Sequence, residues 1–236
     1  MVEFAYAVGR VRALEVHLLD ESRIIRMTEA KDFESAYLVL QESSFFADKI
    51  DQLPHPFDFD ALLELELNTT RQILTDLAPG NHWLDLLWKK YEPGMTLNAY
   101  LQLLENAIKD CPSRILISYA CGFIILNQLK IELMKGKFDP ETVIARFRYT
   151  DYHRAVSQGM ESFKKTGSLF ALEREIDNQL TETVKNAKYK AFGLEPLVGF
   201  MVAREIEIKI IRLILTCKQL GIRTDEIKER MRLSYV

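Results

Sequence analysis

The chain has 236 residues, with 31 lysines and arginines against 34 aspartates and glutamates, so its formal net charge is −3. This near balance gives no electrostatic argument for nucleic-acid binding. Hydrophobic residues make up 48% of the chain, which is typical of a globular protein with one large or two ordinary domains. Glycine is scarce and β-branched residues rarely alternate, so we expect an all-α fold.

The first half of the chain predicts a series of short and medium helices. Their expected ranges are 4–19, 20–27, 32–41, 58–77, 82–90 and 96–109. Residues 43–56 end in Leu53-Pro54-His55-Pro56 and are expected to form a loop. Asp58 or Asp60 is placed to cap the helix that follows. The break at Cys111-Pro112 predicts an N-terminal helical domain, 1–112, and a C-terminal helical domain, 113–236.

Four further helices are expected before the last stretch of the chain. Their ranges are 115–135, 140–147, 151–165 and 168–191. The longest apolar run, 115–126, is much shorter than the roughly 20 residues that span a bilayer. We therefore expect no membrane-spanning helix. The amino end is charged within its first ten residues and lacks the apolar run of a secretory signal, which favours a cytoplasmic location.

The last stretch predicts a largely buried helix followed by a short one. From Leu197 to about Leu220 nothing breaks a helix, and Gly221 is placed to end it. Its polar positions form one narrow face, which we expect to be solvated: Glu205, Lys209, Arg212, Thr216 and Gln219, widened by Arg204, Glu207 and Lys218. Thr224 is expected to cap the short second helix, which runs to about Leu233 and carries Arg230 and Arg232 near its end.

Three short segments share a pattern of an acid, an arginine five residues later and then a bulky apolar residue. They are 21–27, 141–147 and 225–231. One interpretation is ordinary helix-dipole chemistry, since short helices favour acids first and bases last. The other interpretation is an internal repeat.

The carboxyl end resembles the C subunit of V-type (archaeal-type) ATPases and ATP synthases, which is related to the d subunit of eukaryotic vacuolar pumps. The residues that carry the resemblance are Glu195, Pro196, Ala203, Arg204, Glu205, Glu207, Ile208, Lys209, Arg212, Gly221, Ile227, Lys228, Glu229, Arg230, Met231, Arg232, Tyr235 and Val236. Shorter matches are Tyr6, Arg10, Arg12 and Ala13 near the start, and Leu172, Glu173, Arg174 and Asp177 further along.

The resemblance implies an all-α protein of related helical bundle domains in a pseudo-symmetric arrangement. The chain is short for the family, so remnants of three repeats, with a reduced central portion, are expected. The implied function is a non-catalytic socket that couples the rotating central stalk to the membrane ring of ion-carrying subunits, peripheral to the membrane. Partner contacts are then expected at Glu205, Lys209, Arg212, Arg230 and Arg232, and no cofactor or metal is implied.

Two other functions remain open on the residues alone. The same architecture would serve a scaffold or adaptor of another complex, and a helical-bundle enzyme with a metal or hydrophobic ligand is the second alternative. The sequence has neither a phosphate-binding glycine loop nor an HExxH or CxxC motif. Its four histidines, His17, His55, His82 and His153, lie far apart in sequence. We therefore predict that the chain alone neither binds nor hydrolyses ATP.

Overall fold

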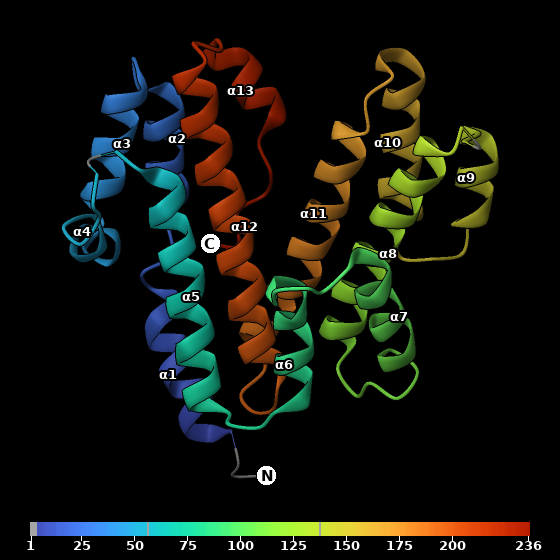
Figure 1. Cartoon of the computed structure of the whole chain (residues 1–236), viewed down its shortest axis with the longest axis horizontal. Coiled ribbons are helices and arrows are strands. Elements are labelled where there is room, and N and C mark those ends of the chain that lie inside the picture. The colour runs from blue at the N-terminus through green and yellow to red at the C-terminus, as the bar shows by residue number, and fades with distance from the viewer. Residues whose placement is uncertain (1–3, 56, 137) are drawn as a thin grey trace. The chain divides into compact units, whose positions relative to one another are not determined.

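The computed structural model describes residues 4–55, 57–136 and 138–236. Within these ranges the secondary structure is helical and contains no strand, which confirms the all-α prediction (Figure 1). The elements are α1 (Ala5–Glu15), α2 (Glu21–Glu29), α3 (Phe33–Gln41), α4 (Ser44–Ile50), α5 (Phe59–Leu77), α6 (His82–Trp88), η1 (Lys89–Tyr91), α7 (Leu97–Ala107), α8 (Arg114–Met134), α9 (Pro140–Arg146), α10 (His153–Thr166), α11 (Phe170–Lys185), η2 (Asn186–Tyr189), α12 (Glu195–Gln219) and α13 (Thr224–Arg230).

Several helix ends follow from local side-chain chemistry. The Asp58 carboxylate accepts a hydrogen bond from the Ala61 amide at 3.0 Å, and Asp139 accepts one from the Thr142 amide at 2.9 Å. Each satisfies an amide that the first turn of a helix leaves without a partner. At the end of α12, Gly221 has a φ of 68° and the Ile222 amide donates to the Cys217 carbonyl at 2.9 Å. This left-handed glycine ends α12 where the sequence predicted.

Three local predictions were wrong. The expected loop at 43–56 contains the helix α4, because the prolines lie only after it; Pro56 itself is outside the described residues. The final helix ends at Arg230 rather than near Leu233. Thr224 does not cap it, since its hydroxyl instead accepts a hydrogen bond from the Lys218 ammonium at 3.3 Å.

The chain groups into two compact units. Unit 1 contains residues 1–81 and 188–236, and unit 2 contains residues 82–187. This grouping differs from the ranges expected from the sequence, 1–112 and 113–236. The physical reason is that the last long helix, α12, returns to pack mainly on α1, α3 and α5, near the start of the chain.

Unit 1 is built around α12. This 25-residue helix packs against α1, α2, α3, α5 and α13, and most of its residues are buried. Its apolar residues from Leu197 to Ile214 form much of the unit 1 core. A helix that is apolar over most of its girth has to be surrounded in this way, because exposing it would cost the free energy of hydrating that surface.

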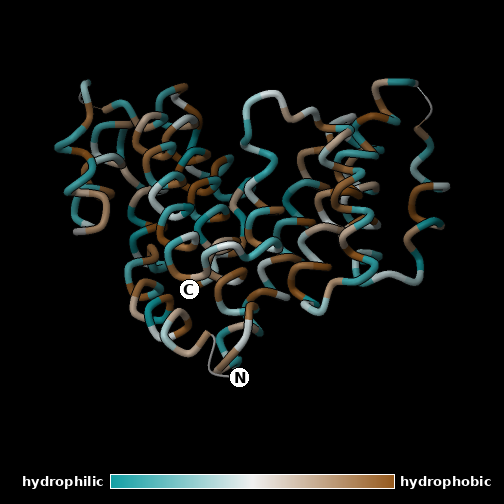
Figure 2. The backbone as a smooth tube through the Cα atoms, turned by 60° about the horizontal axis from the view of Figure 1, so that its bottom comes forward, coloured by the Kyte–Doolittle hydropathy of each residue, from teal (hydrophilic) through white to brown (hydrophobic). Residues whose placement is uncertain are grey.

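Unit 2 contains α6 to α11 and has two clusters of buried residues. One lies around Leu129, Val156 and Leu172, and the other around Tyr100, Leu104 and Ala120. In Figure 2, hydrophobic and hydrophilic positions alternate along most helices, as expected for helices buried on one face. Among the described residues, α8 alone is long and apolar enough to cross a membrane, a test that core helices also pass.

The three segments with the shared acid–arginine pattern form α2, α9 and α13, each after a longer helix. In two of them the arginine joins the short helix to a neighbour. Arg26 pairs with Glu42, with a closest distance of 2.6 Å, and Arg146 pairs with Glu132 on α8 at 2.7 Å. These two pairs account for the arginines of α2 and α9 locally, without requiring a repeat.

Candidate functional site

The polar face of α12 divides into a buried half and an exposed half. Arg204, Glu205 and Glu207 are buried, with Arg204 completely inaccessible and Glu205 only 8% exposed. Lys209 and Arg212, one and two turns further along, are exposed. The prediction of a solvated stripe along the whole helix was therefore wrong for its first half, because neighbouring helices of unit 1 cover it.

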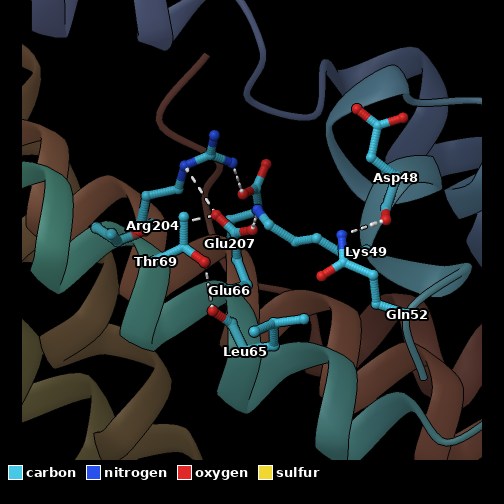
Figure 3. Close-up of polar contacts among 9 residues, drawn as sticks. Asp48, Lys49, Gln52, Leu65, Glu66, Thr69, Arg204 and Glu207 are labelled. Atoms are coloured by element: carbon cyan, nitrogen blue, oxygen red, sulfur yellow. Dashed lines mark hydrogen bonds and ion pairs between the residues drawn. The ribbon is translucent and has the colours of Figure 1, made fainter. Parts of the chain in front are cut away.

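Arg204 lies at the centre of the buried half. Its Nη1 donates to Glu207 Oε2 at 2.5 Å, and its Nε lies 3.7 Å from Glu66 Oε1 (Figure 3). Its guanidinium carbon is 4.1 Å from the centroid of the Phe45 ring and 5.4 Å from that of Phe200. The electron-rich faces of these two rings thus help to stabilise a cation that is shielded from water.

Nε and Nη2 of Arg204 donate no hydrogen bond to any part of the chain that the structure describes. Buried guanidinium groups normally satisfy most of their five donors. Here the ion pairs and the aromatic rings supply the stabilisation instead. The positive charge of Arg204 is therefore stabilised by two carboxylates and two aromatic rings rather than by a full set of hydrogen bonds.

Glu66 on α5 and Lys49 on α4 complete the cluster. The Lys49 ammonium donates to Glu66 Oε2, and the Thr70 hydroxyl donates to Glu66 Oε1 at 3.4 Å. The buried charge cluster is defined here as Lys49, Glu66, Arg204 and Glu207. In its ionised form it has two positive and two negative charges, so it is neutral as a group, which limits the cost of removing charges from water.

Glu207 connects the buried charge cluster to the segment before α2. The Leu19 amide donates to Glu207 Oε1 at 2.5 Å. Burial raises the pKa of the Glu207 carboxyl, while the charge of Arg204 and the Leu19 amide oppose this rise. Burial likewise lowers the pKa of the Lys49 ammonium, against the attraction of Glu66.

The surroundings of the buried charge cluster do not suit a substrate. The cavity beside Glu207 has a volume of about 10 Å³, roughly the space for one water. Its lining includes Leu18, Ile206 and Tyr235. Within residues 4–55, 57–136 and 138–236, His, Cys, Asp and Glu side chains form no group of three that could hold a metal ion. The ion pairs of the buried charge cluster link α4 to α5 and α5 to α12.

The other predicted contact residues lie nearer the surface. Arg212 Nε is 3.2 Å from Asp60 Oδ1 on α5, and both side chains are at least half exposed. Arg230 is exposed at the end of α13, and Arg232, just beyond it, is half-buried. Exposed pairs of this kind contribute little stability and leave the charges accessible to a partner.

Sequence reasoning missed Lys49 and Glu66. A signal for Glu66 was present, because it falls on the same face of α5 as the buried residues Leu62, Leu63 and Leu74. An acid on an apolar face predicts a buried charge that needs a partner. Lys49 gave no comparable signal, since it lies in the segment that was expected to be a loop.

Comparison with known proteins gives a family match over most of the chain. Residues 7–93 and 104–230 match the profile of the family described as the ATP synthase (C/AC39) subunit. Both stretches include parts of the two units, and the second contains Arg204, Glu207 and α13. The match therefore extends well beyond the carboxyl end that carried most of the resemblance.

Individual relatives have the same kind of name. The A-type ATP synthase C subunit of Haloferax volcanii is 23% identical over 220 residues, 90% of this chain and 62% of the relative. The A-type ATP synthase C subunit of Methanocaldococcus jannaschii is 30% identical over 89 residues, which are 37% of this chain and 22% of the relative. The V-type sodium ATPase C subunit of Enterococcus hirae is 34% identical over 86 residues, which are 36% of this chain and 26% of the relative. The chain thus spans between about a fifth and three-fifths of the relatives that it matches.

Proposed function

The chain belongs to the ATP synthase (C/AC39) subunit family, and from this premise we propose that it is a non-catalytic subunit of a rotary ion-translocating ATPase or ATP synthase. The family match over residues 7–93 and 104–230 is the observation that carries the proposal. In this role the chain would lie on the cytoplasmic face of the membrane, held there by the complex.

We further propose that the chain is the socket between the rotating central stalk and the membrane ring of ion-carrying subunits. A part that transmits torque has to resist deformation, since any flexing loses the coupling between rotation and ion movement. The construction of unit 1 supports this role. Its longest helix is surrounded by neighbours, and the ion pairs of the buried charge cluster link that helix to α5 and α5 to α4.

The docking surface proposed for a partner is the exposed half of the polar face of α12, together with the end of α13. It presents the positive charges of Lys209, Arg212, Arg230 and Arg232. These charges would steer an acidic partner surface towards the chain and set its orientation. Glu205, which was predicted to be part of this surface, is buried and is better suited to a structural role.

Reconstitution with and without the chain tests the proposal. The stalk subunits, the ring and the catalytic head from the same source would be assembled in vesicles, and ATP-driven ion uptake would be measured beside ATP hydrolysis. We expect uptake only when the chain is present, with hydrolysis persisting without it. Unchanged uptake in its absence would contradict the socket role. Failure of the chain to join this assembly, combined with stable binding to another complex, would favour a general scaffold.

A further inference from the structure

A short exposed segment of unit 1 has a composition that the proposed function does not explain. Residues 188–192, Lys-Tyr-Lys-Ala-Phe, comprise the last two residues of η2 and the three residues that follow it towards α12. All five residues are exposed, and the two aromatic side chains are among the most exposed large hydrophobic groups, with Tyr189 at 87% and Phe192 at 61%. We call residues 188–192 the basic-aromatic segment.

The basic-aromatic segment is held on the surface of unit 1 rather than hanging free. The Arg12 guanidinium on α1 donates to the Lys190 carbonyl at 3.2 Å. The Lys188 ammonium donates to the Tyr235 carbonyl at 2.8 Å and lies 4.4 Å from the centroid of the Tyr235 ring. Gly193 follows with a φ of 99°, which turns the chain directly into α12. These contacts fix the backbone while Tyr189, Lys190 and Phe192 remain exposed.

The charge of the basic-aromatic segment is opposite to that of the chain as a whole. It contains two lysines and no acid, whereas the complete chain has a net charge of −3. The nearest acid on α1, Glu15, is already engaged by Arg12 at 2.7 Å and by the Tyr235 hydroxyl at 2.7 Å. In the sequence, the next acid is Glu195, in the first turn of α12. The segment is therefore a local site of positive charge.

We propose that the basic-aromatic segment binds an anionic phospholipid surface. Lysines are attracted to acidic headgroups, and tyrosine and phenylalanine rings insert at the level of the headgroups. Protein interfaces and headgroup layers both take up tyrosine and phenylalanine, but protein interfaces are depleted in lysine, so the two lysines favour the lipid surface. This inference goes beyond the proposed function and does not require it, since the segment and its supports all belong to unit 1.

Vesicle binding by the purified chain tests the proposal without any other component of a complex. Sedimentation would be measured with vesicles of phosphatidylcholine containing phosphatidylserine, and with phosphatidylcholine alone. We expect binding to the anionic vesicles only, decreasing as salt is added. Lys190→Glu should weaken binding at least about five-fold, the effect of roughly one headgroup-bound lysine. Tyr189→Ser and Phe192→Ser should each weaken it less.

Matched control variants are available at the other end of α12, which is about 37 Å long at 1.5 Å per residue. Leu220, at that end, is 70% exposed, and Leu220→Ser removes a similarly exposed apolar side chain. Lys31 is exposed and lies near the same end of α12. The carbonyl of its neighbour Ala30 accepts a hydrogen bond from Lys218 of α12 at 2.5 Å. Lys31→Glu makes the same change of charge as Lys190→Glu. Both controls should bind vesicles as the unaltered chain does.

Three outcomes would overturn the proposal. The first is no binding to anionic vesicles. The second is binding that Lys31→Glu weakens as much as Lys190→Glu, which would mean that overall charge decides. The third is loss of binding to the other subunits in Lys190→Glu with vesicle binding unchanged, which would assign the segment to a protein partner. Thermal melting of each variant would exclude unfolding as the cause. None of these outcomes decides the socket role, which the reconstitution tests separately.

Discussion

The longest helices of the two units look alike in sequence but are buried by different means. Both α12 in unit 1 and α8 in unit 2 are long and mostly apolar. The buried residues of α12 include Arg204, Glu205 and Glu207, whereas those of α8 include no charged residue. The core around α12 therefore depends on balanced charges, whereas the surface that α8 buries is stabilised in another way; the buried acid of unit 2, Asp177, lies on α11.

Unit 2 uses close helix packing and hydroxyl groups. A Cβ atom added at Gly159 on α10 would lie 2.6 Å from the Leu172 Cα on α11, so only glycine allows this approach. The buried Tyr152 hydroxyl donates to the Ser118 carbonyl on α8 at 2.7 Å. We therefore expect the stability of unit 1 to be sensitive to changes of charge at α12, and that of unit 2 to small changes of volume between its helices.

The largest expected effect comes from removing the central cation of unit 1. Arg204→Met leaves Glu66 and Glu207 buried without a guanidinium, which should lower the free energy of unfolding by about 3–5 kcal/mol. Denaturant unfolding followed by circular dichroism measures this loss. Arg212→Met on the same helix is the matched control, since its half-exposed pair with Asp60 should contribute about 1 kcal/mol or less.

Two spectroscopic probes sharpen this prediction. Both tryptophans, Trp83 and Trp88, lie in unit 2, so tryptophan fluorescence reports on that unit, whereas circular dichroism reports on both. Arg204→Met should shift the dichroism transition more than the fluorescence transition. Equal shifts of both transitions would show that the units unfold as one, and would remove the basis for treating their cores as independent.

A smaller effect is expected from adding one methyl group to unit 2. Gly159→Ala places its Cβ against the Leu172 backbone, so α10 and α11 must move apart, at a cost of about 1–3 kcal/mol. The tryptophan transition should shift to lower denaturant concentration. Gly9→Ala in α1 is the control, because outside the adjacent backbone of α1 no described atom lies within 4 Å of a Cβ added there. That change should stabilise its helix by up to about 1 kcal/mol.

The pH dependence of stability gives a further contrast between the units. Burial raises the pKa of Glu207 above its ordinary value of 4.5. Between that value and the raised pKa, the folded chain binds more protons than the unfolded chain, so the free energy of unfolding falls as pH rises. One group can contribute a slope of at most about 1.4 kcal/mol per pH unit.

Glu207→Gln isolates this contribution. Asp32 and Asp139 have pKa values lowered by hydrogen bonds, and they make stability fall as pH drops through lower values. Both groups are present in the variant, so their effects cancel when the two stability curves are subtracted. The free energy of unfolding of the unaltered chain minus that of Glu207→Gln should decrease as pH rises above about 4.5. A flat difference would mean that Glu207 titrates normally and that its burial has no energetic consequence.

The features that could be predicted from sequence are those decided by neighbouring residues. The starts of α5 and α9 follow from Asp58 and Asp139, and the end of α12 follows from Gly221, because each involves groups within a few residues. The helix α4 could not be predicted from the prolines at positions 54 and 56, because a proline limits the residues next to it and α4 ends at Ile50. Helical periodicity similarly predicted a polar face on α12, which the structure has.

What could not be predicted is which part of that polar face is covered. Arg204 meets Glu66, which is far away in the sequence, and the pairing exists only once α5 and α12 are packed together. Glu66 on an apolar stripe indicated a buried acid but not its partner. A single sequence holds no information on such a distant pairing, so buried Arg204 and exposed Arg212 looked equivalent.

The smallest expected effect on stability separates these two arginines. Arg212→Glu should change the free energy of unfolding by no more than about 0.5 kcal/mol, because Arg212 and Asp60 are both at least half exposed. If the exposed half of the polar face is a docking surface, the variant should associate more slowly with the stalk or ring subunits. The measurement is the association rate beside a melting curve, with Arg154→Glu, an exposed arginine of unit 2, as control.

A charge swap decides how such a loss would arise. Asp60→Arg combined with Arg212→Glu restores an ion pair between α5 and α12 but leaves the charge at position 212 reversed. If Arg212 contacts the partner directly, the double variant should still associate slowly. Recovery of the normal rate would mean that the pair, or the net charge of that face, is what the partner requires. Normal association of Arg212→Glu itself would make this half of the helix ordinary solvated surface, and the docking residues would have to lie elsewhere.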